Sequence, residues 1–336
     1  MSSASSMTTL GLRVAVLPLL AWAAAGCARA SRTEPAPAPL TPDRYAILPQ
    51  PAHVVARPGE LRLDGSTRIV LSDTSAALRT IAELFAVPLR AASGLPLPVV
   101  QSSAADSPGA IVMTLAAAAS PDSARQRESY RLVVTERGAT LSAPTPAGLL
   151  NGIQTIRQLL PPDAARGVRA TSPWQSLGAA SPAATPPTVE RWSLPAVEID
   201  DAPRFAYRGI LLDVGRYYFP PEFLKELVDL LALYKYNRLH LHFTDDQGWR
   251  IEIKKYPRLT SVGAWRKETQ VAQNFEPYVG DKKPHGGFYT QEQLRDLVAY
   301  AAARNVTIVP EIEMPGHAGA AIAAYPELAC TPGPFA

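Results

Sequence analysis

Apolar residues recur at regular spacing through the first half of the chain. Alternation of apolar and polar residues predicts strands at Thr67–Asp73 and Ala110–Leu115. A longer alternating run, Tyr130–Ala143, contains Glu-Arg-Gly-Ala, which predicts a hairpin turn between two strands. Helical spacing at Ser75–Ala86 and Pro146–Leu160 separates these strands. Strands and helices mixed in this order predict an α+β domain.

The second half of the chain alternates between strands and helices. A buried strand at Arg208–Val214 precedes a helix that begins at Pro221, and a second strand follows at Arg238–Thr244. The next helix, Thr290–Asn305, begins with Thr-x-x-Gln, a capping-box pattern, and leads into a third strand at Val306–Glu313. This alternation predicts a parallel sheet.

Three strand-helix units suggest the beginning of a (β/α)8, or TIM, barrel. A complete barrel of this kind takes about 250 residues, whereas Asp201 to Ala336 supplies 136. We therefore expect an α+β N-terminal domain followed by the first three βα units of an incomplete (β/α)8 TIM barrel. The expected organisation is a lipoprotein-type signal peptide (1–27), a linker (28–42), the α+β domain (43–161), a linker or insertion rich in Ala, Pro and Ser (162–200) and the partial barrel (201–336).

The N-terminal residues predict export. Arg13 precedes an apolar run, Val14–Gly26, that is short for a membrane-spanning helix. The run ends in Ala-Ala-Gly-Cys, which resembles a bacterial lipobox and predicts lipid attachment at Cys27. An ordinary signal peptide with an incidental cysteine is the alternative. We expect an exported, membrane-anchored lipoprotein of the periplasm, outer membrane or cell surface, in which Cys330 has no partner cysteine.

Composition narrows the class of ligand. Hydrophobic residues make up 47% of the chain and charged residues 19%, which is typical of a globular protein. The 33 basic and 30 acidic residues give a net charge of +3, and no block of Lys and Arg occurs. The charge pattern therefore argues against nucleic acid as a partner and predicts a neutral or weakly charged ligand.

Polar side chains follow all three predicted barrel strands. Parallel strands bring their carboxyl ends to one face of a barrel, so residues distant in sequence become neighbours there. The candidate site residues are Asp213 and Arg216 at or just after the end of the first strand, Asp245 and Asp246 after the second, and Glu311, Glu313 and His317 at or just after the end of the third.

Two histidines on the second strand are candidate metal ligands. His240 and His242 share one face of the strand, and such a pair binds metal in amidohydrolase-like barrels. Their spacing to Asp245 does not match the usual His-x-His-x-Asp-His pattern. The alternative is that both histidines line the barrel and are hydrogen-bonded there. His53 and His285 have no neighbours in sequence that would support a catalytic or metal-binding role, which predicts surface positions for both.

Several segments together resemble one enzyme family. The stretches YRGILLDVGRYYFP, YKYNRLHLHFTDDQGWRIEIKKYPRLTSVGAWR and GGFYTQEQLRDLVAYAAARNVTIVPEIEMPGHAGAAIAAYPELAC are similar to the start of the catalytic barrel of family 20 glycoside hydrolases, the β-N-acetylhexosaminidases. The preceding YAILPQPAHVV and GLLNGIQTIRQLLP resemble the α+β domain that comes before that barrel. The resemblance covers Asp43 to Cys330.

The resemblance implies a role for each matching residue. Arg216 would bind the C3 and C4 hydroxyls of the terminal sugar through its guanidinium. Asp245 and His317 would form a relay that orients the general acid, with the carboxylate about 2.6–3.2 Å from the imidazole. Glu313 stands where many relatives have Asp. Asp246, adjacent to Asp245 and therefore on the opposite face, would stabilise the loop. No metal or cofactor is implied.

The resemblance also implies the reaction and the acid that performs it. Family 20 enzymes release terminal non-reducing N-acetylglucosamine or N-acetylgalactosamine with retention, using the substrate's own acetamido oxygen as nucleophile. Their Asp-Glu pair lies in a Gly-Gly-Asp-Glu motif after the fourth strand, which this sequence does not contain. We therefore expect the pair downstream of Ala336 and the 336-residue chain to be inactive. The alternative is a non-catalytic sugar-binding lipoprotein. The Pro-Glu-Leu-Ala-Cys segment resembles a family segment whose cysteine, here Cys330, can pair with one further along.

Overall fold

The computed structural model describes residues 45–72, 74–102, 108–116, 124–161, 192–271, 277–331 and 333. The predicted signal peptide, Cys27 and the 28–42 linker lie outside the described residues, as do residues 162–191. In the described part of the chain, no helix has both the length and the apolar character needed to cross a membrane.

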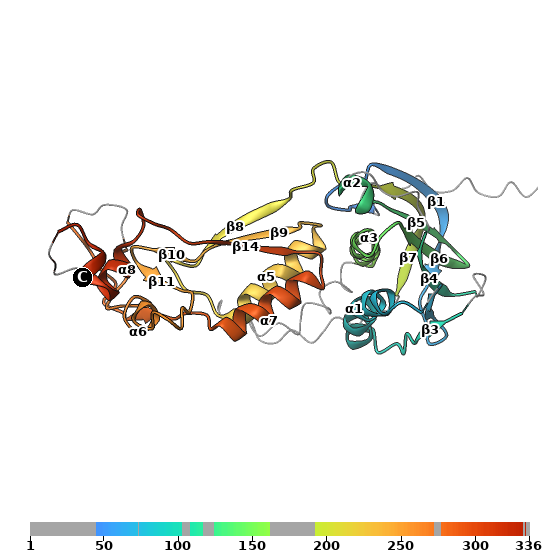
Figure 1. The fold of residues 1–336 in the computed structure, drawn as a ribbon. Coiled ribbons are helices and arrows are strands. Elements are labelled where there is room, and N and C mark those ends of the chain that lie inside the picture. The colour runs from blue at the N-terminus through green and yellow to red at the C-terminus, as the bar shows by residue number, and fades with distance from the viewer. Residues whose placement is uncertain are drawn as a thin grey trace, which may run out of the picture. The chain divides into compact units, whose positions relative to one another are not determined.

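A seven-stranded sheet forms the first domain (Figure 1). Its order is β1-β7-β5-β6-β4-β2-β3. The strands are β1 (His53–Arg62), β2 (Arg68–Leu71), β3 (Val99–Gln101), β4 (Ala110–Leu115), β5 (Tyr130–Thr135), β6 (Gly138–Ala143) and β7 (Ser193–Asp201), and the helices are α1 (Ala76–Ser93), the short α2 (Ala124–Arg127) and α3 (Pro146–Leu159). Helices α1 and α3 cover one face of the sheet, where alternate strand residues such as Leu132 and Val134 are buried in the core.

The predicted elements of this domain are confirmed, and the structure adds others to them. The Glu-Arg-Gly-Ala stretch does turn the chain between the antiparallel β5 and β6. Helix α1 continues beyond its predicted end to Ser93, with Pro88 inside it, and β1 and β3 were not predicted.

The predicted linker boundary at residue 200 is wrong. Ser193–Asp201 is strand β7, which pairs with both β1 and β5 and buries Leu194, Val197 and Ile199 in the core of the first domain. The strand was missed because its partners lie far upstream in the sequence, so no local hairpin pattern reveals the pairing.

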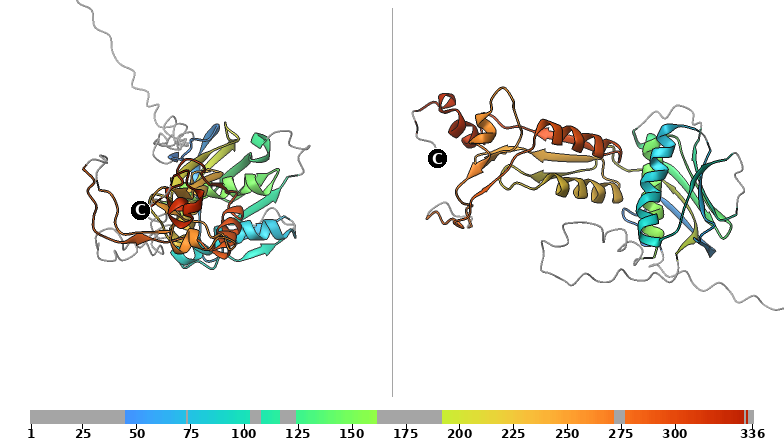
Figure 2. Two further views of the ribbon diagram at one scale, coloured as in Figure 1. Left: turned by 60° about the vertical axis from the view of Figure 1, so that its left-hand side comes forward. Right: turned by 90° about the horizontal axis from the view of Figure 1, so that it is seen from below.

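The second half of the chain forms a parallel three-stranded sheet of β8 (Gly209–Asp213), β9 (Arg238–His242) and β14 (Thr307–Glu311), with β9 in the middle. Helices α5 (Pro221–Leu233) and α7 (Gln291–Ala302) lie side by side on one face of it (Figure 2). The capping box predicted at Thr290 is present, with Gln293 as its second member. The smaller elements are β10 (Thr244–Asp245), β11 (Gly248–Trp249), α6 (Arg258–Ser261), β12 (Trp265–Arg266), β13 (His285–Gly286), α8 (Gly319–Ala324) and the 3-10 turn η3 (Pro326–Leu328).

Buried polar contacts join the first domain to the parallel sheet. Lys235, between α5 and β9, is 5% exposed and places its Nζ 2.9 Å from Tyr130 Oη and 3.0 Å from Asp201 Oδ2. Arg208, just before β8, forms an ion pair with Glu128 of the first domain. The chain just before each of the first two parallel strands is therefore tied to the α+β domain by charges that have little access to water.

We expect Lys235→Met to lower the free energy of unfolding by about 3 kcal/mol, because removing one partner leaves the buried Asp201 carboxylate uncompensated. Lys254→Met is the matched control, since the Lys254–Glu292 pair is more than half exposed and an exposed pair contributes little to stability. Urea unfolding followed by circular dichroism measures both. Equal losses in the two variants would contradict the proposed strength of the buried pair.

Candidate active site

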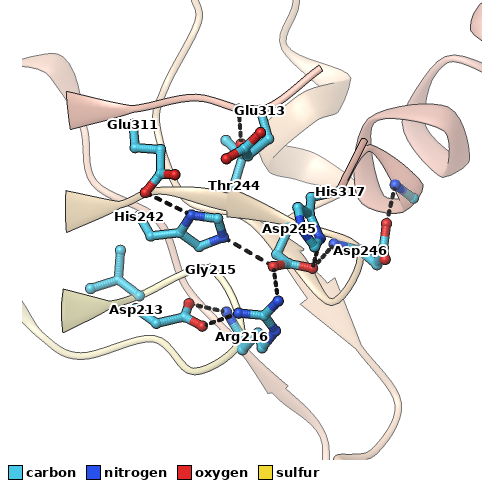
Figure 3. Close-up of polar contacts among 12 residues, drawn as sticks. Asp213, Gly215, Arg216, His242, Thr244, Asp245, Asp246, Glu311, Glu313 and His317 are labelled. Atoms are coloured by element: carbon cyan, nitrogen blue, oxygen red, sulfur yellow. Dashed lines mark hydrogen bonds and ion pairs between the residues drawn. The ribbon is translucent and has the colours of Figure 1, made fainter. Parts of the chain in front are cut away.

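The three parallel strands end side by side, and their last residues are neighbours across the sheet. In its register, His242 of β9 pairs with Asp213 of β8 and with Glu311 of β14. Figure 3 shows His242 between these two carboxylates, with the other predicted site residues around them. The sheet therefore brings together the polar groups predicted at the three strand ends.

Asp245 lies at the centre of this cluster, and its side chain is only 1% exposed. Its Oδ2 accepts a hydrogen bond from His242 Nε2 at 3.0 Å and lies 2.7 Å from Arg216 Nη2. Its Oδ1 accepts the main-chain N–H of Asp246 at 2.6 Å and lies 3.3 Å from His317 Nδ1. One buried carboxylate thus contacts groups that follow all three strands.

These contacts keep Asp245 ionised. Burial by itself would raise the pKa of the Asp245 carboxyl, but hydrogen bonds from His242 and from the Asp246 main chain, together with the charges of Arg216 and His317, outweigh it and hold the pKa below its usual value. An anionic carboxylate with all of these partners is suited to orienting its neighbours rather than to donating a proton or attacking a carbon.

Arg216 is held by two carboxylates and remains open to solvent. Its Nη1 donates to Asp213 Oδ2 at 2.6 Å, its main-chain N–H donates to Asp213 Oδ1 at 2.9 Å, and its Nη2 contacts Asp245. Its side chain is 51% exposed. Because a guanidinium carries five N–H donors, the arrangement leaves donors for a ligand.

His317 follows β14 and reaches back to Asp245. The 3.3 Å between its Nδ1 and Asp245 Oδ1 is slightly beyond the range expected from the sequence. The backbone of His317 has a φ of +49°, which lies in the left-handed region that residues other than glycine rarely adopt. Such strain costs about 1–3 kcal/mol and is typical of functional sites. The imidazole is about half exposed, so it can face a further group.

Asp246 points to a different partner from its neighbour. Its Oδ1 accepts the main-chain N–H of Gly319 at 2.9 Å, at the start of α8, and its side chain is exposed. This is the loop-stabilising position predicted for Asp246.

His240 and His242 both lie close to one carboxylate, that of Glu311. His240 Nε2 and His242 Nδ1 lie 2.9 and 3.0 Å from Glu311 Oε2. Burial would lower the pKa of His242, but its contacts with Asp245 and Glu311 outweigh burial and raise it. Burial would raise the pKa of Glu311, but its contacts with His242 and Glu313, together with the charges of His242 and His240, outweigh burial and lower it. His242, which is hydrogen-bonded to Asp245, therefore fits the alternative in which these histidines line the barrel, and His240 lies beside the same Glu311 carboxylate.

Three groups of described residues place possible metal ligands within 4.8 Å of one another. They are Asp213, His242 and Asp245; His242, Glu311 and Glu313; and Asp245, Asp246 and His317. Both ring nitrogens of His242 already face carboxylates, so a metal bound by His242 would displace one of these contacts. Glu313, also predicted at the site, donates its main-chain N–H to the buried Thr244 Oγ1 at 2.8 Å.

The surface position predicted for His285 is wrong. Its ring stacks on Tyr217 with ring centroids 4.0 Å apart, and its Nε2 accepts the main-chain N–H of Tyr218 at 3.0 Å. Burial and the positive charges of Arg266 and Arg250 lower the pKa of His285 to about 4. No local sequence pattern signals this position, because the partners of His285 come from the loop after β8, more than sixty residues upstream.

We expect His242 and His285 to titrate on opposite sides of the ordinary histidine pKa of 6.5. The stability due to His242 is present below pH 6.5 and is lost as pH rises through its raised pKa, whereas that due to His285 is present above pH 6.5 and is lost as pH falls towards 4. NMR titration of the ring protons measures both, with His242→Gln and His285→Gln assigning the signals. Two midpoints near 6.5 would contradict this.

Comparison with known proteins matches both halves of the chain to one family. The model described as glycosyl hydrolase family 20, domain 2, matches residues 44–202, and the model of the glycosyl hydrolase family 20 catalytic domain matches residues 205–334. The β-hexosaminidase of Porphyromonas gingivalis is 40% identical over 289 residues, which are 86% of this chain and 33% of that protein. The β-N-acetylhexosaminidase of Cellulomonas fimi is 33% identical over 283 residues, covering 84% of this chain and 49% of the relative.

A solved structure gives the same family assignment. The N-acetyl-β-hexosaminidase of Streptomyces plicatus, in complex with Thio-NAglucal, superimposes with a TM-score of 0.68 at 37% identity, over 90% of this chain and 52% of that one. The chain thus spans about half the length of this structure and a third to a half of the two curated relatives. The α+β domain therefore corresponds to domain 2 of such a hydrolase, and the parallel βα units correspond to part of its catalytic domain. The chain belongs to glycoside hydrolase family 20.

Proposed function

We propose that the protein is a β-N-acetylhexosaminidase, which releases terminal N-acetylglucosamine or N-acetylgalactosamine from the non-reducing ends of oligosaccharides or glycoconjugates with retention of configuration. The observation that carries the proposal is the contact of Arg216 and His317 with the same buried Asp245 in a family 20 chain. A mutant of the related Streptomyces plicatus β-hexosaminidase has been solved in complex with the product GlcNAc, which supports the same class of ligand here.

Arg216 has the chemistry to hold the terminal sugar. Its two carboxylate partners, Asp213 and Asp245, fix the guanidinium, and the exposed side chain keeps further N–H donors available. Two neighbouring hydroxyls of a pyranose, such as those at C3 and C4, match the fork of an arginine. Sugar binding therefore requires no rearrangement of the guanidinium.

Asp245 and His317 have the chemistry to orient an acid. An ionised Asp245 favours the tautomer of His317 that carries its proton on Nδ1, which leaves Nε2 to face a further carboxylic acid. In a substrate-assisted reaction this acid protonates the leaving oxygen while the acetamido oxygen of the substrate attacks the anomeric carbon.

We further propose that the three βα units are the first three of an eight-unit barrel, and that the acid comes from a later unit. The parallel order β8-β9-β14, which follows the chain order of a barrel, supports this. So does the coverage of only 52% of the Streptomyces plicatus structure. On this proposal the 336-residue chain binds the sugar but does not hydrolyse its bond.

We expect the full product of the gene to hydrolyse an aryl N-acetyl-β-D-glucosaminide and not the matching aryl β-D-glucoside, which lacks the acetamido nucleophile. The 336-residue chain should release no aryl alcohol from either. Turnover by this chain would refute the proposed origin of the acid. Binding of the glucosaminide without hydrolysis by the full gene product would instead favour a sugar-binding lipoprotein.

We expect Arg216→Ala to weaken binding of N-acetylglucosamine to the 336-residue chain by about tenfold or more, because hydrogen bonds from a charged group contribute about 1.5–3 kcal/mol. Titration calorimetry or saturation-transfer NMR measures the change. Arg258→Ala is the control, since Arg258 is also about half exposed and pairs with an exposed carboxylate, that of Glu327, away from the site. Equal affinity in Arg216→Ala and the unaltered chain would remove Arg216 from the sugar site.

We also propose that the mature protein is an exported lipoprotein anchored through Cys27, on the basis of the Ala-Ala-Gly-Cys segment that follows an apolar run. Cys27→Ser should abolish incorporation of labelled fatty acid and move the protein from the detergent phase to the aqueous phase on Triton X-114 partitioning. Cys330→Ser, which removes an exposed free cysteine, should change neither. Detergent-phase partitioning of Cys27→Ser would contradict lipid anchoring at this residue.

A further inference from the structure

Arg250 is a fully buried cation beside the candidate site. It follows β11 and is 0% exposed. Among the described residues, it is the largest side chain that is fully buried. Burial, followed by the charge of Arg266, lowers its pKa to about 10, so the guanidinium remains protonated at neutral pH. Within the described parts of the chain it forms no ion pair with a carboxylate. A buried charge of this kind is costly unless its donors are satisfied.

Main-chain carbonyls satisfy the guanidinium of Arg250. Nε donates to Val214 O at 3.1 Å and Gly215 O at 3.2 Å, and Nη2 donates to Gly215 O at 3.0 Å. Nη1 donates to Ala264 O at 2.5 Å and to Gly287 O at 3.1 Å. These carbonyls belong to three separate segments: the loop after β8, the residue before β12 and the residue after β13. One side chain therefore joins three loops.

The loop that Arg250 holds is the one that carries Arg216. Gly215 directly precedes Arg216, and on its other side it lies so close to Asp245 that an added Cβ would be 3.2 Å from the Cβ of Asp245. A Cβ at Gly248 would be 2.2 Å from Arg250 Nη2, so glycine there leaves room for the guanidinium. The main chain before Arg216 is thus confined between Arg250 and Asp245.

We propose that Arg250 is a positioning residue for sugar binding: it fixes the Val214–Gly215 main chain so that the Arg216 guanidinium stays between Asp213 and Asp245 and presents its free donors to the sugar. The inference rests on the proposed sugar-binding role of Arg216. A lysine at position 250 keeps the charge but offers three donors from a single atom, which cannot reach three separate segments in the same way as a planar guanidinium.

A double-mutant cycle on the 336-residue chain tests the inference, with N-acetylglucosamine as the probe. Arg250→Lys should weaken binding about tenfold in the unaltered background and less than twofold in the Arg216→Lys background, because its effect acts through Arg216. Arg208→Lys is the matched control. Arg208 also donates to two main-chain carbonyls, those of Lys235 at 2.7 Å and Phe205 at 2.8 Å, but at the opposite end of β8. Arg208→Lys should lower thermal stability and change affinity by the same factor in both backgrounds.

Hydrogen exchange gives a readout that does not depend on the sugar. The main-chain N–H groups of Val214 and Gly215 donate to His242 O at 3.2 and 2.9 Å. They should exchange faster in Arg250→Lys and at the original rate in Arg208→Lys. Unchanged exchange at these two positions, or equal effects of Arg250→Lys in both backgrounds, would overturn the inference.

If Arg250→Lys does not fold, a second variant tests the same inference. Gly248→Ala keeps the arginine but forces its guanidinium to move, and it should give the same faster exchange at Val214 and Gly215. Slow exchange at both positions in a folded Gly248→Ala would also overturn the inference. If Arg216→Lys leaves sugar affinity unchanged, the proposed role of Arg216 fails, whereas the exchange experiment still decides whether Arg250 positions the loop.

Discussion

The buried carboxylate of Asp245 is the constraint on which the rest of the candidate site depends. An anion with 1% exposure has lost its water, so the protein must supply donors and positive charge in its place. They come from Arg216 after β8, His242 at the end of β9 and His317 after β14, together with the main chain of Asp246. Asp245 can be buried at this cost only when the ends of all three strands have come together.

The main chain around Asp245 is shaped to serve these contacts. The β10–β11 hairpin places Asp245 opposite Gly248, and Gly215 passes close to Asp245 from the neighbouring loop. Beyond β14, His317 adopts a left-handed backbone conformation on its way to the same carboxylate. The strained backbone at His317 and the close approach of Gly215 thus accompany the contacts that His317 and Arg216 make with Asp245.

The resulting electrostatics divide the site into two kinds of group. The carboxylates of Asp213, Asp245 and Glu311 each contact a guanidinium or an imidazole. These contacts fix the orientation of the arginine and histidine side chains. Arg216 and His317 each have one side held by this framework and the other side exposed. On the proposed function, a sugar would contact the exposed side of Arg216 and an acid that of His317, and groups held in advance lose little entropy on binding.

Much of the architecture follows from local patterns. The helices that begin at Pro221 and after Thr290, the β5–β6 hairpin and the three parallel strands were all predicted, because spacing, proline at a helix start and a capping box act within a few residues. The set of polar residues at the strand ends was predicted for the same reason, since the carboxyl ends of parallel strands share one edge.

Only the tertiary structure decided how these groups pair. It made Ser193–Asp201 a strand of the first domain, placed two histidines on Glu311 and buried Arg250 among the carbonyls of three loops. Each of these pairings joins residues that are far apart in sequence, and none leaves a periodic signature. The sequence by itself determined which elements form and which residues stand at their ends. The partners of Asp245 and of Arg250 were decided by the packing of those elements, because a buried charge is satisfied by whatever groups the fold brings within hydrogen-bonding distance.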